Sequence, residues 1–436
     1  MSPPSRRIPA LLRADVPFRR FWTGQTVSLI GDQITLIALP LVAVIVLHAD
    51  AAQMGHLTAA GLLPNLLFAL HAGAWVDRRS RRREVMIGAD AGRAVLLAAI
   101  PMSAALGVLS LTELYVIAFL VGTSSVFFMV AYQTLFVSLV PPDRFVEGNS
   151  LLNGSRALSG VAGPSLGGLL VQALTAPGAI AIDALSFVVS AVFLARIAPV
   201  EPAPEPGRRG LVLAGVRFIA GSALVGPALA ATATINFFNF AFFALFVLYV
   251  TLTLNVQPAA LGLVLGCGAV GGVAGAALTG RVVRRLGIGR AFMLGCAAFP
   301  APLVLVPLAG GPRLVVLGAL FAAEFGAGLG VMVLDISAGS IFAAVVPDRL
   351  RSRVSGAYMT VNYGVRPLGA LAAGALAGVI GVRPTLLIAV FGALLGVLWL
   401  LPSPMVRLRE LPTSTGEDAE EALVGDPCEH GFGESA

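Results

Sequence analysis

Residues 21–47 read FWTGQTVSLIGDQITLIALPLVAVIVL, and this stretch decides the fold class. The run exceeds the ~20 apolar residues that a helix needs to cross a bilayer. Five arginines precede it, and it is too long for the apolar core of a signal peptide. We therefore expect an uncleaved first transmembrane helix.

The composition extends this expectation to the whole chain. Of its 436 residues, 57% are hydrophobic and 12% charged, and the mean hydropathy is +0.89. These values argue against a soluble enzyme, a disordered chain or a nucleic-acid module. All 29 basic residues are arginines, so any proton chemistry falls to the acids, and a lysine-dependent phosphate loop for ATP hydrolysis is excluded.

Twelve windows are long and apolar enough to span a membrane. They lie near residues 22–47, 54–75, 85–109, 114–139, 150–174, 177–197, 227–253, 259–284, 290–309, 314–345, 354–379 and 384–401. This pattern predicts an all-α polytopic membrane protein with 12 transmembrane helices. No cofactor or metal is expected, because the His and Cys residues are scattered.

The arginines divide unequally between the two sides of the predicted bundle. The N-terminal segment, the even-numbered loops and the C-terminal flank hold 24, whereas the odd-numbered loops hold only Arg313 and Arg383. Because arginine accumulates in cytoplasmic loops, we expect both termini in the cytoplasm and the chain in the cell membrane, surrounded by lipid.

A polar, proline-rich stretch divides six predicted helices from six. We expect a cytoplasmic N-terminal segment (1–20), an N-terminal bundle (21–198), a cytoplasmic linker (199–222), a C-terminal bundle (223–402) and an acidic, disordered cytoplasmic tail (403–436).

The two bundles also share sequence. GAWVDRRSRRR begins at Gly73, and GRVVRRLGIGR begins 207 residues later at Gly280. VPPDR at Val140 is matched by VPDR at Val346, 206 residues on. Two segments with nearly the same offset predict pseudo-symmetric halves, the arrangement with which transporters alternate access to a central site.

The same segments carry a resemblance to the major facilitator superfamily over about residues 18–402. Its loop signature is matched by Gly73, Asp77, Arg78, Arg81 and Arg82, and the fifth-helix signature of its antiporters by Gly163, Pro164, Gly167 and Gly168. The chain most resembles bacterial drug, macrolide and siderophore exporters, among them enterobactin exporters. It departs from the pattern at Ser80, where glycine is usual, and in the fourth helix, which lacks the arginine motif of many drug antiporters.

This resemblance implies a role for each motif. The loop from Gly73 to Arg82 would be a cytoplasmic gate in which Asp77 latches the halves together. The resemblance also places helices five, eight and eleven where the halves meet. Glycines four residues apart, Gly163 and Gly167, independently favour close helix packing in lipid.

Charged residues at membrane depth cost about 2.5–3.5 kcal/mol each on insertion scales and are normally partnered. Asp90 and Arg93 can pair locally on one helix, which favours a structural role. Asp183 can snorkel towards the nearby helix end, and Asp335 lies close to the end of a long helix. The full set of candidates is Asp32, Asp90, Arg93, Arg156, Asp183, Glu324, Asp335 and Arg366.

Asp32 is the strongest candidate for proton coupling or substrate binding, because it lies in the middle of the first predicted helix. A carboxylate there can exchange a proton when a cation arrives or leaves; the alternative is a buried structural acid. By resemblance, Asp32 would face Asn239 across the central cavity. Glu324 is a second candidate acid, and Arg156 and Arg366 are the expected countercharges.

Aromatic and amide side chains on the fourth and seventh predicted helices can line a cavity for a bulky amphipathic molecule. The expected lining residues are Gln33, Tyr132, Gln133, Asn236, Asn239 and Phe243. Ordinary packing between helices, or contact with lipid, is the alternative for each of them.

Together these features predict a monomeric secondary exporter that moves an amphipathic small organic molecule by proton antiport. Import or facilitated diffusion of a nutrient on the same scaffold is the alternative. A membrane-embedded enzyme or a channel is disfavoured, because no catalytic or ligand cluster and no ring of charges is visible.

Overall fold

The computed structural model describes residues 10–77, 81–198 and 212–411, and within these ranges the chain is helical, without strands. The N-terminal half comprises α1 (Ala10–Ala14), α2 (Val16–Leu41), the π-helical turn η1 (Val42–Val46), α3 (Ala51–Asp77), α4 (Arg82–Ala105), α5 (Leu111–Leu139), the 3-10 turn η2 (Pro142–Arg144), α6 (Phe145–Leu174) and α7 (Ala176–Ala195).

The C-terminal half repeats this order. It comprises α8 (Val212–Gly221), α9 (Val225–Leu248), the π-helical turn η3 (Tyr249–Thr253), α10 (Pro258–Leu286), α11 (Ile288–Ala298), η4 (Ala301–Val304), α12 (Leu305–Leu308), α13 (Arg313–Val345), α14 (Arg351–Ile380), α15 (Val382–Leu394), η5 (Leu395–Leu400) and η6 (Pro404–Arg407). The helix α8 lies inside the stretch that the sequence presents as a linker.

Twelve spans agree with the structure. Eleven helical segments of the described ranges are long and apolar enough to cross a membrane, and α3, with 27 residues, occupies the place of the second expected span. The ninth span is broken into α11, η4 and α12, because Pro300, Pro302 and Pro307 cannot donate backbone hydrogen bonds.

Local sequence fixes where several helices begin. The Asp15 carboxylate accepts a hydrogen bond from the Phe18 amide at 2.8 Å and so caps α2. Ser110 caps α5 in the same way, by accepting from the Glu113 amide. These side chains satisfy amides that a helix start otherwise leaves without partners.

Backbone irregularities recur at the spacing of the sequence repeat. The turns η1 and η3 begin at Val42 and Tyr249, 207 residues apart. His48 and Asn255, also 207 residues apart, both adopt positive φ angles, of 53° and 52°. Such conformations are uncommon for residues other than glycine, so their recurrence indicates that the two halves share one backbone design.

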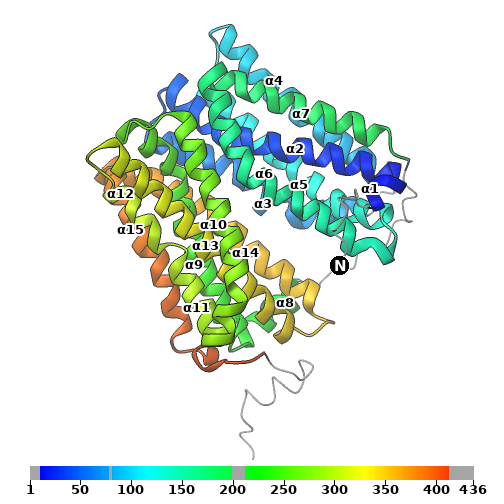
Figure 1. Cartoon of the computed structure of the whole chain (residues 1–436), viewed down its shortest axis with the longest axis vertical. Helices are drawn as coiled ribbons and strands as arrows, with labels where there is room; N and C mark the ends of the chain where they lie inside the picture. Colours follow the sequence, from blue (N-terminus) through cyan, green and yellow to red (C-terminus); the bar gives the residue numbers. More distant parts are fainter. Residues whose placement is uncertain (1–9, 78–80, 199–211, 412–436) are drawn as a thin grey trace, which may run out of the picture.

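The two halves form a V in which they touch at one end and diverge towards α1 and α8 (Figure 1). Contact between them is made chiefly by α6 against α10 and by α3 against α14. Glycines bring these backbones together. A Cβ atom on Gly168 would lie 3.0 Å from the Cα of Gly262, and one on Gly55 would lie 3.0 Å from the Cα of Gly374.

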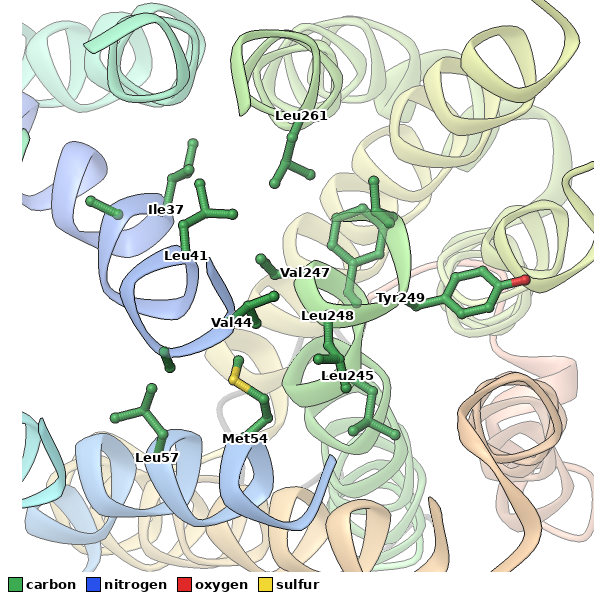
Figure 2. Packing of buried hydrophobic residues seen from close by; sticks show 14 of the residues in the cluster. Ile37, Leu41, Val44, Met54, Leu57, Leu245, Val247, Leu248, Tyr249 and Leu261 are labelled. Atoms are coloured by element: carbon green, nitrogen blue, oxygen red, sulfur yellow. The ribbon is translucent and has the colours of Figure 1, made fainter. Parts of the chain in front are cut away.

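At the joined end, buried side chains from both halves gather into what we call the apolar seal (Figure 2). It lies where α2 and α9 end and where α3 and α10 begin, so it closes the bundle opposite to α1 and α8. The seal consists of Ile37, Leu41, Val44, Met54, Leu57, Leu245, Val247, Leu248, Tyr249 and Leu261.

Candidate functional site

A cavity of about 300 Å³ lies between α2, α3, α4, α5 and α9, beside the apolar seal. Leu57 belongs to both the cavity wall and the seal. The wall is mostly aliphatic, with Phe240 and Phe243 contributed by the C-terminal half. Such a wall suits an apolar or amphipathic molecule, for which contact area supplies most of the affinity.

Asp32 is the only charged residue among the described residues that line this cavity. Its side chain is exposed and opens into the cavity, in the company of Thr35 on the next turn of α2. The carboxylate therefore meets whatever occupies the cavity, rather than the lipid around the bundle. Phe240 and Phe243, rather than Asn239, are the α9 residues in the lining described for this cavity.

A second carboxylate, Asp183 on α7, lies behind the cavity wall and is fully buried. The Thr35 hydroxyl donates a hydrogen bond to one of its oxygens, and the Ser186 hydroxyl donates to the other at 2.9 Å. Asp183 therefore does not snorkel, contrary to the expectation from sequence, because two hydroxyls satisfy it inside the bundle.

Gly31 allows α7 to approach α2 at this point. A Cβ atom at position 31 would lie 2.2 Å from Asp183 Oδ1 and 2.1 Å from Ser186 Oγ. We expect Gly31→Ala to lower the free energy of unfolding by about 1–3 kcal/mol, the usual effect of overpacking. Thermal unfolding in detergent measures this change.

The control is Gly88→Ala on α4, where an added Cβ would meet nothing within 4 Å. It should be neutral or slightly stabilising, because alanine favours a helix more than glycine does. Equal melting temperatures for the two variants would show that α7 can shift to accommodate a methyl group at position 31.

Arg93 and Asp90 form a buried ion pair on α4, as their spacing predicts. The Arg93 guanidinium carbon lies 4.4 Å from the ring centroid of Phe128 and 4.1 Å from that of Phe187. The rings and the Asp90 carboxylate hold the cation in place. Arg93 also interacts electrostatically with Asp32 and Asp183, so besides pairing with Asp90, as the sequence predicts, it is a countercharge for the other two acids of the N-terminal half.

In the C-terminal half, Arg366 ties α14 to α9. Its Nε donates to Asn236 Oδ1 at 2.9 Å, and Asn236 Nδ2 in turn donates to Asn362 Oδ1 at 3.0 Å. The guanidinium lies 4.1 Å from the ring centroid of Tyr363 and 4.8 Å from that of Phe240. Phe240 therefore connects this polar network to the cavity wall.

The other predicted charges lie apart from the cavity lining. Glu324 on α13 is half-buried and packs on α10, where a Cβ on Gly268 would lie 3.1 Å from its Oε2. Arg156 is exposed on α6, with its guanidinium carbon 5.4 Å from the Tyr132 ring centroid. Asp335 on α13 is exposed and interacts electrostatically with Arg366.

Two of the predicted lining residues serve in helix packing. Tyr132 is buried and stacks on Phe21, with 5.4 Å between ring centroids. Gln33 packs on α6: a Cβ added to Gly163 would lie 2.5 Å from the Cβ of Gln33. Gln133 is exposed and Asn239 half-buried. Phe243 is the predicted lining residue that the cavity wall includes.

The glycines of α6 pack in two directions. Gly163 and Gly167 face α2, whereas Gly168 faces α10. Pro164 also contacts α10: a Cβ on Gly262 would lie 2.3 Å from the Pro164 carbonyl oxygen. This helix therefore fits against its own half and against the other half at once.

The predicted gate loop is described only in part. Arg78 and the Asp77 side chain lie outside the described residues. Gly73 has open space where a Cβ would project, Arg81 pairs with Glu84 at 3.3 Å, and Arg82 is buried.

Comparison with known proteins identifies the family. The sequence model of the Major Facilitator Superfamily matches residues 21–370. The multidrug efflux pump Tap of Mycolicibacterium fortuitum is 30% identical over 403 residues, which cover 87% of this chain and 93% of that protein. The uncharacterized MFS-type transporter YfiS of Bacillus subtilis is 27% identical, over 84% of this chain and 88% of its own length.

Solved structures share the fold at low sequence identity. The nucleoside transporter NupG, as its D323A mutant, has a TM-score of 0.72 at 13% identity, over 88% of this chain and 99% of that chain. A bacterial homologue of the iron transporter ferroportin, in an inward-facing state, has a TM-score of 0.67 at 16% identity, over 90% and 99%. With this fold and this family match, the chain belongs to the Major Facilitator Superfamily and is a multi-pass membrane transporter, not an enzyme.

Proposed function

We propose that this protein is a secondary exporter that moves an amphipathic small organic molecule out of the cell in exchange for protons. The observation that supports this most is the single carboxylate of Asp32 in a cavity wall that is otherwise uncharged and mostly aliphatic and aromatic. The apolar body of a substrate would lie against Phe240 and Phe243, while its polar end would meet Asp32. The protein would act as a monomer in the cell membrane.

The shape of the bundle fits the first step of export. With both termini in the cytoplasm, as the arginine distribution predicts, the halves diverge towards the cytoplasm and the apolar seal closes the outside. The cavity would then receive its substrate from inside the cell. Rocking of the halves about the α6–α10 and α3–α14 contacts would expose it to the other side.

Proton exchange supplies enough free energy for this task. Each pH unit contributes about 1.36 kcal/mol per proton, and each 100 mV contributes about 2.3 kcal/mol per charge. One proton across one pH unit therefore sustains about a tenfold substrate gradient.

The relatives favour export over import. The multidrug efflux pump Tap matches this chain over most of both lengths. The solved structures include a nucleoside transporter, which keeps uptake of a nutrient as the second candidate. The amphipathic character of the cavity favours the first.

Everted membrane vesicles with an imposed pH gradient, acidic inside, test the proposal. We expect them to accumulate one or more compounds from a panel of dyes, antibiotics and siderophores, and to lose them when an uncoupler removes the gradient. Vesicles without the protein are the control. Accumulation that ignores the uncoupler would reject proton coupling, and accumulation in right-side-out cells but not in everted vesicles would indicate import.

A further inference from the structure

Asp183 is a fully buried carboxylate whose two oxygens are each bonded to a hydroxyl. Burying an ionisable group inside the membrane costs free energy of desolvation. A serine or an asparagine could accept the same two hydrogen bonds without a charge, so the presence of an aspartate calls for an explanation. Asp183 has no exposed surface and is not among the residues that line the cavity. Whatever Asp183 does must pass through its hydrogen-bond partners.

Thr35 is the partner that leads to the cavity. It lies one turn after Asp32 on α2, and both residues are in the cavity wall. The Thr35 hydroxyl donates to Asp183 on the far side of that wall. The only other partner, among the described residues, is Ser186, which is buried on the same helix as Asp183. Among the described residues, Thr35 is thus the one that both lines the cavity and donates a hydrogen bond to Asp183.

The charges around Asp183 do not balance. Asp32 faces it from α2, and Arg93 faces it from α4 together with Asp90, to which Arg93 is paired. Among the described residues of α6, none adds a charge to this group. If all three acids were ionised, three negative charges would share one guanidinium in a medium of low dielectric. If one of the three acids binds a proton, two negative charges remain beside the guanidinium and the repulsion among the acids falls.

We propose that Asp183 carries the exchanged proton and Asp32 meets the substrate, with the Thr35 hydroxyl passing the proton between Asp183 and the cavity. This division of roles rests on the proposed function. On loading, Thr35 gives its hydroxyl proton to the Asp183 carboxylate and accepts one from a hydronium ion in the cavity, which is left as water. On release, each O–H bond breaks and forms in the opposite order. No other group changes its protonation.

The arrangement couples the two ligands through charge. A substrate whose polar end is cationic, or donates hydrogen bonds, offsets the negative charge of Asp32. The repulsion between Asp32 and Asp183 then falls, and Asp183 can release its proton as the substrate binds. After the halves rock, a proton that binds Asp183 removes one of the negative charges that attract the polar end of the substrate, and this favours release of the substrate. This order of events is antiport.

Asp183→Asn separates proton coupling from substrate movement. We expect gradient-driven accumulation in vesicles to fall at least about tenfold. Exchange of labelled for unlabelled substrate at equal pH on both sides should stay within about twofold, because Asp32 and the cavity wall are unchanged. The probe is ethidium or, failing that, the first panel compound that wild-type vesicles accumulate. Full gradient-driven accumulation by this variant would overturn the inference.

The role of Thr35 is tested by substitution with and without the hydroxyl. Thr35→Val should slow gradient-driven transport, and Thr35→Ser should restore most of it. The matched control is Thr123→Val on α5, because the Thr123 hydroxyl bonds its own helix at Phe119 and lies outside the cavity wall. Equal rates for Thr35→Val and Thr35→Ser would reject the relay.

A measurement without substrate keeps this inference separate from the proposed function. Infrared difference spectra of the purified protein between two pH values should show the band of a protonated carboxyl group. We expect Asp183→Asn to lose this band and Asp32→Asn to keep it; the reverse result would assign the proton to Asp32. If wild-type vesicles move no compound but the band follows Asp183, the proposed function fails while the proton site stands.

Discussion

Asp32→Asn is expected to reduce gradient-driven export at least about tenfold, which corresponds to about 1.4 kcal/mol. The amide keeps the size of the side chain but removes the only charge in the described cavity wall. Unlike Asp183→Asn, this variant should also lose exchange at equal pH, because the polar contact to the substrate itself is weakened. Initial rates in everted vesicles, with and without a pH gradient, measure both effects.

The matched control is Glu410→Gln, which removes one carboxylate from an exposed position after the last helix. Its rates should equal those of the wild type. If Asp32→Asn also transports at the wild-type rate, Asp32 is a structural acid and the cavity recognises its substrate by apolar contact alone.

Gly168→Val should prevent the two halves from closing at the apolar seal. A Cβ atom there would lie 2.3 Å from the Pro258 carbonyl oxygen, and backbone on α10 cannot rotate away as a side chain can. The halves must separate or the bundle must strain, at a cost of about 1–3 kcal/mol. We expect roughly a tenfold loss of transport and a shift towards states in which the seal is open.

Labelling detects the open seal directly. Leu41 lies in the seal with 1% of its surface exposed, so Leu41→Cys, in a chain without its three native cysteines, should react slowly with a membrane-impermeant thiol reagent. Adding Gly168→Val should accelerate the reaction. Gly154→Val on the same helix is the control, since its Cβ would meet nothing within 4 Å. If neither Gly168→Val nor Gly154→Val changes the labelling rate of Leu41→Cys, α10 moves enough to accommodate the larger side chain while the seal stays closed.

Length, hydropathy and repetition were enough to predict the fold. Windows of spanning length predicted twelve helices because a bilayer demands that length, and the structure agrees. The repeat offset of 207 residues recurs in the backbone, at His48 and Asn255. The small residues Gly163 and Gly167 predicted a close contact between helices, and the structure places both against α2, where there is little space for a larger side chain.

The site was predicted less completely, because position along a helix does not give rotation about it. Asp32 and Phe243, two of the expected site residues, lie in the wall of the cavity between α2, α3, α4, α5 and α9, whereas Tyr132 packs in the core. Neighbours on a helix point about 100° apart, so Phe240 can line the cavity where Asn239 was expected. The pairing of Asp183 with Thr35 joins residues 148 positions apart, and only tertiary packing reveals it.

The make-up of the apolar seal affects how the protein responds to its surroundings. None of the ion pairs between described residues lies in the seal, which is closed by aliphatic and aromatic contacts. Opening it wets hydrocarbon, a process with a large heat-capacity change and little sensitivity to ionic strength. Opening of the seal itself is therefore expected to depend on temperature far more than on salt.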